Sequence, residues 1–304
     1  MYTISVCMIV KNEEKNLRNC LTPLKRIADE IIVVDTGSTD RTKEIAREFT
    51  DKIYDFEWTC DFAAARNFAF SHATCDYIYS ADADEVIDPE NMRVFERLKM
   101  CLVPEVEIIT MIYVNPADIN MAYNNLRERR PKLFKRLRTF TWIDEIHETI
   151  RLDPVVYDSD IEILHKPHEN HSKRDFETFK KILEEKGDMS GRLWSMYAKE
   201  LFFNGDKDDF LFAKTYFEKR VTTSEEFSSL EAMCVVVRSW AENDYFDEVS
   251  GFIDELKYFK TTPAEIDYSL GRIFEKQGDN VTAQKYFDKS KHDESFVCVK
   301  YKAE

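Results

Sequence analysis

Apolar and polar blocks alternate along the first 85 residues of the chain. Four runs have the length and composition of strands, at residues 4–10, 30–35, 52–56 and 77–81. Three segments with helical spacing of apolar residues separate them, at residues 16–26, 41–48 and 62–73. Strands that alternate with helices in this way predict an α/β domain with a parallel sheet.

Polar residues gather where three of the predicted strands end. The clusters cover Lys11–Glu14, Asp35–Asp40 and Asp82–Glu85. Ligands of open parallel sheets bind beyond the carboxyl ends of the strands. We therefore expect the three clusters to meet in one crevice.

The third cluster contains two carboxylates separated by one alanine. In an extended segment, residues i and i+2 point to the same side, so Asp82 and Asp84 can face one ligand together. Two adjacent acids repel each other unless a cation lies between them, and Mg²⁺ or Mn²⁺ is held by one or two carboxylates together with phosphate oxygens. The alternative is a solvated strand end, which is common in so acidic a chain.

The character of the sequence changes after about residue 171. Glycine and proline become rare, and short turns separate segments of helical pattern. Val237 and Val249 precede Gly271 and Ala283 by 34 residues each, which is the period of the tetratricopeptide repeat. The sequence thus predicts two domains, an α/β domain over residues 1–171 and an all-α repeat domain over 172–304. A generic helical bundle is the alternative for the second.

Net charge, cysteine pattern and hydrophobic runs exclude several classes of protein. The net charge of −15 argues against binding to nucleic acid, because a phosphate backbone would be repelled. Seven scattered cysteines without a C-x-x-C pair favour reduced thiols over a disulfide framework. No run approaches the roughly 20 apolar residues of a membrane span. We expect a cytoplasmic protein.

Several motifs resemble one enzyme family, and they occur in its order. They are the segments 5–14 (SVCMIVKNEE), 31–40 (IIVVDTGSTD), 62–67 (FAAARN), 82–84 (DAD), 130–136 (RPKLFKR) and 146–148 (IHE). The N-terminal 170 residues resemble the family 2 glycosyltransferases of the GT-A fold, which is Rossmann-like, and in particular bacterial members that modify proteins or lipopolysaccharide cores. Where the family often has two successive acids, this chain has Asp35 followed by Thr36.

The resemblance implies a nucleotide-sugar donor, usually a UDP-sugar, together with Mn²⁺ or Mg²⁺. It assigns Asp84 as the direct metal ligand, Asp82 to the ribose or to metal-bound water, and Asp35 to the uracil ring. Arg66, a lone arginine on an alanine-lined helix, suits a base or a phosphate. The remaining candidates for donor binding end the first strand: Val10, Lys11 and Glu13.

The general base is expected between residues 144 and 148. His147 and Glu148 match family positions, and Asp144 is a local alternative that stands where related sequences often carry glycine. If residues 141–150 form one strand, Asp144 and Glu148 share a face. An exposed acidic loop is the competing interpretation.

A third metal ligand is expected at His165, which follows a predicted strand over 161–164. Some GT-A enzymes complete the metal shell with a histidine late in the domain. His165, His168 and His171 also have the i, i+3, i+6 spacing of a helical zinc site, but Pro167 would break such a helix.

The sequence therefore predicts a metal-dependent, inverting glycosyltransferase that moves a hexose or N-acetylhexosamine to a protein side chain, such as Ser or Thr of a flagellin or a peptide. Transfer to a lipopolysaccharide or cell-wall glycan is the first alternative. A non-catalytic repeat protein that binds peptides is the second.

Overall fold

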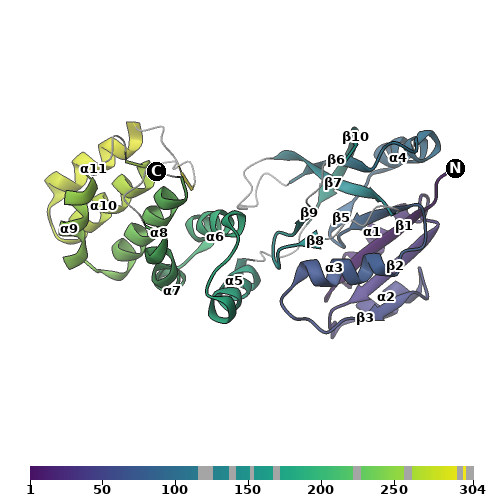
Figure 1. Cartoon of the computed structure of the whole chain (residues 1–304), viewed down its shortest axis with the longest axis horizontal. Coiled ribbons are helices and arrows are strands. Elements are labelled where there is room, and N and C mark those ends of the chain that lie inside the picture. The colour runs from purple at the N-terminus through teal and green to yellow at the C-terminus, as the bar shows by residue number, and fades with distance from the viewer. Residues whose placement is uncertain are drawn as a thin grey trace. The chain divides into compact units, whose positions relative to one another are not determined.

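The computed structural model describes residues 1–115, 126–136, 142–150, 154–166, 172–221, 227–256, 262–292 and 297–298. The chain divides into two compact units, Met1–Asn170 and His171–Glu304 (Figure 1). Within the described residues, no helix combines the length and the apolar character needed to cross a bilayer.

The first unit is built on one eight-stranded sheet in the order β3-β2-β1-β4-β7-β6-β10-β5. Its strands are β1 (Ile4–Val10), β2 (Glu30–Asp35), β3 (Ile53–Asp55), β4 (Tyr77–Ala81), β5 (Glu85–Val86), β6 (Ile108–Val114), β7 (Arg127–Lys135) and β10 (Val156–His165). Strands β3, β2, β1 and β4 run parallel, as the sequence predicts. Strand β7 pairs antiparallel with both β4 and β6, so the sheet as a whole is mixed rather than parallel.

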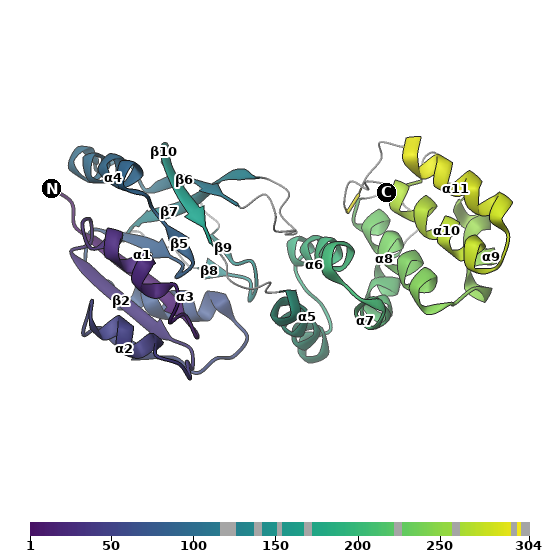
Figure 2. The same cartoon turned by 180° about the vertical axis from the view of Figure 1, so that it is seen from behind.

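Helices cover both faces of this sheet (Figures 1 and 2). The first unit contains α1 (Leu17–Leu24), α2 (Thr42–Arg47), α3 (Phe62–Ser71) and α4 (Pro89–Cys101). Because successive strand residues point to opposite faces, Val6 and Met8 join the core under α1 and α4, whereas Cys7 joins the core under α3. Buried alanines on α3, including Ala65 and Ala69, let this helix approach the sheet closely.

A short hairpin of β8 (Trp142–Ile143) and β9 (Thr149–Ile150) lies apart from the main sheet. The possibility of one continuous strand over 141–150 is therefore wrong. Residues 144–147 form a bend, in which Asp144 (φ 70°) and His147 (φ 48°) adopt left-handed conformations that no extended strand contains.

The second unit is helical throughout its described elements. These are α5 (Ser172–Lys186), α6 (Gly191–Asn204), α7 (Lys207–Phe217), a 3₁₀ turn η1 (Glu218–Arg220), α8 (Phe227–Asn243), α9 (Asp247–Leu256), α10 (Ala264–Lys276) and α11 (Asn280–His292). Gly271 of α10 lies directly against the ring of Phe287 on α11, because a Cβ at Gly271 would be 2.6 Å from that ring. The 34-residue period places Val237 and Gly271 on α8 and α10, but it stays a prediction that these helices form a tetratricopeptide array.

Candidate active site

Two of the three predicted polar clusters are bonded to each other at the carboxyl edge of the sheet. The Thr36 amide donates to the carbonyl of Val10 over 2.9 Å. The Asn12 amide donates to Ser38 Oγ over 2.9 Å, and the Glu13 amide donates to Thr42 Oγ1 over 2.7 Å. The loops after β1 and β2 therefore form one surface. Lys11 is exposed there, whereas Val10 is buried and meets this surface through its backbone.

Asp35, at the end of β2, has one occupied and one open carboxylate oxygen. Its Oδ2 accepts hydrogen bonds from the amides of Gly37 (3.2 Å) and Ser38 (3.0 Å), and Lys43 Nζ lies 3.7 Å from the same oxygen. The left-handed conformation of Gly37 (φ 101°) turns the chain so that both amides point back at Asp35. Its Oδ1 is buried without a hydrogen-bond partner among the described residues. A buried carboxylate oxygen in this state calls for a donor from a ligand or water.

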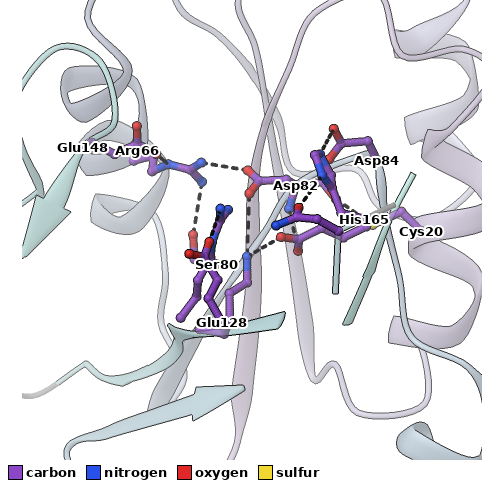
Figure 3. Close-up of polar contacts among 12 residues, drawn as sticks. Cys20, Arg66, Ser80, Asp82, Asp84, Glu128, Glu148 and His165 are labelled. Atoms are coloured by element: carbon purple, nitrogen blue, oxygen red, sulfur yellow. Dashed lines mark hydrogen bonds and ion pairs between the residues drawn. The ribbon is translucent and has the colours of Figure 1, made fainter. Parts of the chain in front are cut away.

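Asp82 and Arg66 form the centre of the site (Figure 3). Arg66 Nη2 lies 2.7 Å from Asp82 Oδ1, its Nη1 donates to Ser80 Oγ over 3.1 Å, and its Nε is paired with Glu148. Burial disfavours both charges. The neighbouring cations Arg66 and Lys132 nevertheless hold the pKa of Asp82 well below its ordinary value, and the pKa of Arg66 is raised by Asp82 and Glu148. Asp82 and Arg66 are thus both held in charged form.

Lys132, on β7, approaches the acidic turn from the sheet. Its Nζ lies 2.7 Å from Glu85 Oε1 and 3.6 Å from Asp82 Oδ2, and its side chain is 6% exposed. Burial raises the pKa of Glu85 even though Lys132 opposes the shift. A buried cation that lies close to two acids offsets the electrostatic repulsion between them. Lys132 therefore keeps the acidic turn compact.

Asp82 and Asp84 do not face the same way. The Glu85 amide donates to the carbonyl of Asp82 over 3.1 Å, which closes a turn between β4 and β5. The expectation of an extended Asp82–Asp84 segment is therefore wrong. The turn arises because the chain leaves β4 and enters β5, an edge strand that pairs with β10 and is separated from β4 by β7, β6 and β10. Figure 3 shows Arg66 and Glu148 on one side of Asp82, and Asp84 with His165 on the other.

Asp84 meets the histidine at the end of β10. Its Oδ2 lies 3.0 Å from His165 Nε2, and His165 Nδ1 lies 3.1 Å from Asn115 Oδ1. The ring of His165 is 9% exposed and packs on Tyr113, with 5.1 Å between ring centroids. His168 and His171, the other members of the predicted zinc pattern, lie outside the described residues.

The donor set at this turn suits a divalent cation. Asp84 Oδ2 and His165 Nε2 are both metal-ligand atoms, whereas the Asp82 carboxylate is already engaged by Arg66 and Lys132. In the described ranges, no three His, Cys, Asp or Glu side chains converge as a complete shell. Asp84 and His165 could supply two ligands to such a cation, and substrate oxygens or water would complete the coordination.

The candidate bases lie on the β8–β9 hairpin, next to α3. The Phe62 amide donates to the carbonyl of Glu145 over 2.8 Å, and Asn67 exchanges two hydrogen bonds with the backbone of Trp142. Glu148 is paired with Arg66, whereas Asp144 and His147 occupy the bend between the two strands.

The sequence patterns predict no role for three side chains of the site: Ser80, Lys132 and Asn115. Only the motif at 130–136 carried a signal, because it contained Lys132. Glu13, by contrast, was expected to bind donor, and its Oε2 accepts from Asn16 Nδ2 over 2.9 Å.

Comparison with known proteins identifies the family of the first unit. Residues 5–150 match the model of glycosyl transferase family 2. The chain carries a family 2 glycosyltransferase domain. That family 2 domain contains β1 to β9, the Asp82–Glu85 turn and the three candidate bases, and it ends before His165.

Relatives cover different parts of the chain. The SPbeta prophage-derived glycosyltransferase SunS of Bacillus subtilis is 24% identical over 98% of this chain and 73% of its own length. A TPR repeat-containing protein of Synechococcus elongatus is 49% identical over 85 residues, which are 28% of this chain and 21% of that protein. An uncharacterized glycosyltransferase of Rickettsia typhi is 37% identical over 30% of each chain.

Solved structures are more distant. Staphylococcus aureus TarS 1–349 in complex with UDP-GlcNAc has a TM-score of 0.42 and 12% identity, over 95% of this chain and 91% of that one. Glucosyl-3-phosphoglycerate synthase of Mycobacterium tuberculosis in complex with Mn²⁺ and UDP-glucose has a TM-score of 0.43 and 13% identity, over 62% of this chain and 81% of that one.

Proposed function

We propose that the chain transfers a sugar from a UDP-sugar to an acceptor with the help of a divalent cation. The observation that carries the proposal is that, inside a family 2 domain, the open Asp35 oxygen and the Asp82–Glu85 turn lie at the ends of β2 and β4, the two parallel strands that flank β1. Both lie at the carboxyl edge of parallel strands, where nucleotides bind in α/β sheets.

Asp35 would recognise the nucleobase. Uracil presents an N–H donor at ring position 3, and the buried Oδ1 of Asp35 needs a donor. Cytosine presents an acceptor at the same position and would leave two acceptors facing each other. We therefore propose uridine as the base of the donor.

Asp84 and His165 would hold Mn²⁺ or Mg²⁺, and Asp82 would accept from the ribose or from water on the cation. When bound, the cation supplies Lewis-acid stabilisation of the departing diphosphate. Arg66 and Lys132 fix the orientation of Asp82 from two sides, so this carboxylate is in place before the donor arrives.

The acceptor hydroxyl would lose its proton to a group in the segment 144–148. An inverting transfer requires a base opposite the leaving diphosphate. Glu148, His147 and Asp144 are the candidates. Glu148 is the one bonded to the centre of the site through Arg66, and it is our first choice.

We propose a protein or peptide as acceptor, because the second unit consists of helical hairpins, and helix-pair arrays form surfaces that bind peptides. A lipopolysaccharide or cell-wall glycan is the other candidate. A non-catalytic peptide-binding module is disfavoured by the intact Asp35, Asp82 and Asp84.

Mass spectrometry tests the proposal directly. The full chain is incubated with Mn²⁺, a panel of UDP-sugars and candidate acceptors, both peptide and glycan. Addition of one sugar mass to a peptide supports the proposal, and addition to a glycan alone favours the second candidate. Release of UDP without either glycosylated product counts against transfer, and so does the absence of UDP release from every UDP-sugar in the panel.

A further inference from the structure

Asn115 lies behind His165 on the side opposite Asp84. It follows directly after β6, is 8% exposed, and places its Oδ1 at 3.1 Å from His165 Nδ1. An amide oxygen accepts hydrogen bonds and cannot donate them. The contact therefore requires a proton on His165 Nδ1.

A proton on Nδ1 determines what the other ring nitrogen can do. In the neutral imidazole with Nδ1–H, Nε2 carries the lone pair. That lone pair points at Asp84 Oδ2 over 3.0 Å, which is also an acceptor. The lone pairs of Nε2 and Oδ2 repel each other at this distance unless a cation binds to both atoms. The geometry of Asn115 therefore prepares His165 and Asp84 as a pair of ligands.

Packing restrains the same ring. Tyr113 lies against His165 with 5.1 Å between centroids, and the guanidinium carbon of Arg130 lies 3.8 Å from the centroid of the Tyr113 ring. These layers limit rotation of the imidazole about its own axis. Asn115 then selects which nitrogen faces Asp84.

We propose that Asn115 is a positioning residue for the metal site, because it holds His165 in the tautomer and orientation that presents Nε2 to a divalent cation. The inference rests on the proposed function, since it assumes that Asp84 and His165 bind the cation. Outer partners of metal-bound histidines generally fix the tautomer, and their loss typically lowers metal affinity by about 10–100-fold.

The test measures the affinity of the full chain for Mn²⁺ alone by electron paramagnetic resonance of free Mn²⁺. Asn115→Leu keeps a similar side-chain volume but removes the acceptor, and we expect its Mn²⁺ affinity to fall by about 10–100-fold. Asn115→Asp restores an acceptor and is expected to bind within a few-fold of the unmodified chain. Asn115→Ala replaces the leucine variant if the latter does not fold.

Asn91→Leu is the matched control. Asn91 Oδ1 accepts from the Glu162 amide over 2.8 Å, so this variant also removes an asparagine oxygen that braces β10. It leaves His165 Nδ1 untouched, and we expect normal Mn²⁺ affinity. Equal loss in Asn91→Leu and Asn115→Leu would show that a loosened β10, and not the tautomer, is responsible.

A second readout separates positioning from mere stability. Imidazole favours Mn²⁺ over Mg²⁺ more than carboxylate does. Asn115→Leu is therefore expected to lose more affinity for Mn²⁺ than for Mg²⁺, as His165→Leu should. An equal loss for both ions in Asn115→Leu contradicts the inference.

The outcomes distinguish this inference from the proposed function. If His165→Leu binds Mn²⁺ as well as the unmodified chain, the metal site itself is wrong and the inference falls with it. If His165→Leu loses affinity while Asn115→Leu does not, the metal site stands and the role of Asn115 is refuted.

Discussion

Arg66 and Glu148 form an ion pair that is largely shielded from solvent, with side chains 11% and 13% exposed. The same guanidinium holds Asp82, so the candidate base and the donor side of the site share one cation. Breaking a buried pair by removing one partner typically costs about 3–5 kcal/mol, because it leaves an uncompensated charge. Neutral variants of similar shape are therefore the proper probes.

Glu148→Gln is expected to lower turnover by about 10²–10⁴-fold, the usual effect of losing a general base. UDP affinity should change little, because the amide oxygen can still accept from Arg66 Nε. Steady-state kinetics and calorimetric titration with UDP measure the two effects. Glu128→Gln, which alters the pair with Arg130, is the control and should retain turnover.

Two further variants complete this test. His147→Ala that binds metal poorly would make His147 a ligand, whereas slow turnover alone would make it a base or the group that orients one. Near-normal rates in Glu148→Gln, His147→Ala and Asp144→Asn together would show that the segment 144–148 is only a charged loop.

Asp35→Asn should weaken UDP binding, because the orphaned Oδ1 loses its charge. A hydrogen bond to a charged group contributes about 1.5–3 kcal/mol, so we expect roughly a 10–100-fold loss of UDP affinity. CDP affinity should not fall in parallel. Asp55→Asn also alters the contact with Lys43 but leaves Asp35 Oδ1 in place, and it serves as the control. Equal loss of UDP and CDP affinity would contradict uracil recognition.

The strands that carry this site could be predicted from the sequence, but the side-chain contacts within the site could not. Continuous apolar runs predicted β1, β2 and β4 almost to the residue, because these strands are buried on both faces. The pairing of Lys132 with Glu85 was not predictable, since it depends on β7 inserting antiparallel beside β4. Local periodicity contains no information on that pairing.

The same limit applies to the acidic turn and to the bend at 144–147. An extended Asp82–Asp84 segment followed from local spacing, but the next strand pairs at the far edge of the sheet and forces a turn. Asn115 carried no local pattern at all. Its contact with His165 joins the ends of two parallel strands, β6 and β10.

Because of Glu30, the free energy of unfolding of the first unit should decrease at acidic pH. Burial would raise the pKa of Glu30, but Lys52, Ser5 and Thr74 lower it from 4.5 to about 2. Since the folded-state pKa is depressed, its stabilisation is complete above pH 4.5 and is lost as the pH falls toward 2. Urea unfolding at a series of pH values should show this loss in the unmodified chain and a smaller one in Glu30→Gln.

The control for Glu30 is an exposed pair. Glu48 is bonded to Arg18, but both side chains are about half exposed, so solvent screens their interaction. Glu48→Gln should leave the acid dependence nearly unchanged. If Glu48→Gln and Glu30→Gln flatten the pH profile equally, the buried network around Glu30 is not the cause.

Gly271→Ala should destabilise the second unit. The added methyl would lie 2.6 Å from the Phe287 ring, and overpacking of this kind costs about 1–3 kcal/mol. A Cβ added at Gly251 of α9 would meet no atom within 4 Å, so Gly251→Ala should be neutral or stabilising by up to about 1 kcal/mol. Thermal unfolding compares the two variants. Similar melting temperatures for both would mean that α10 and α11 do not pack through Gly271.

The most direct test of the whole account is calorimetric titration of UDP into the full chain, with Mn²⁺ and with a chelator, for the unmodified protein and for Asp84→Asn. Asp84 is the carboxylate that faces His165 without an arginine or lysine partner among the described contacts. We predict that Mn²⁺ tightens UDP binding to the unmodified chain by about tenfold or more, which is about 1.4 kcal/mol, and that Asp84→Asn loses this gain. Equal UDP affinity with and without Mn²⁺ in the unmodified chain would contradict the account.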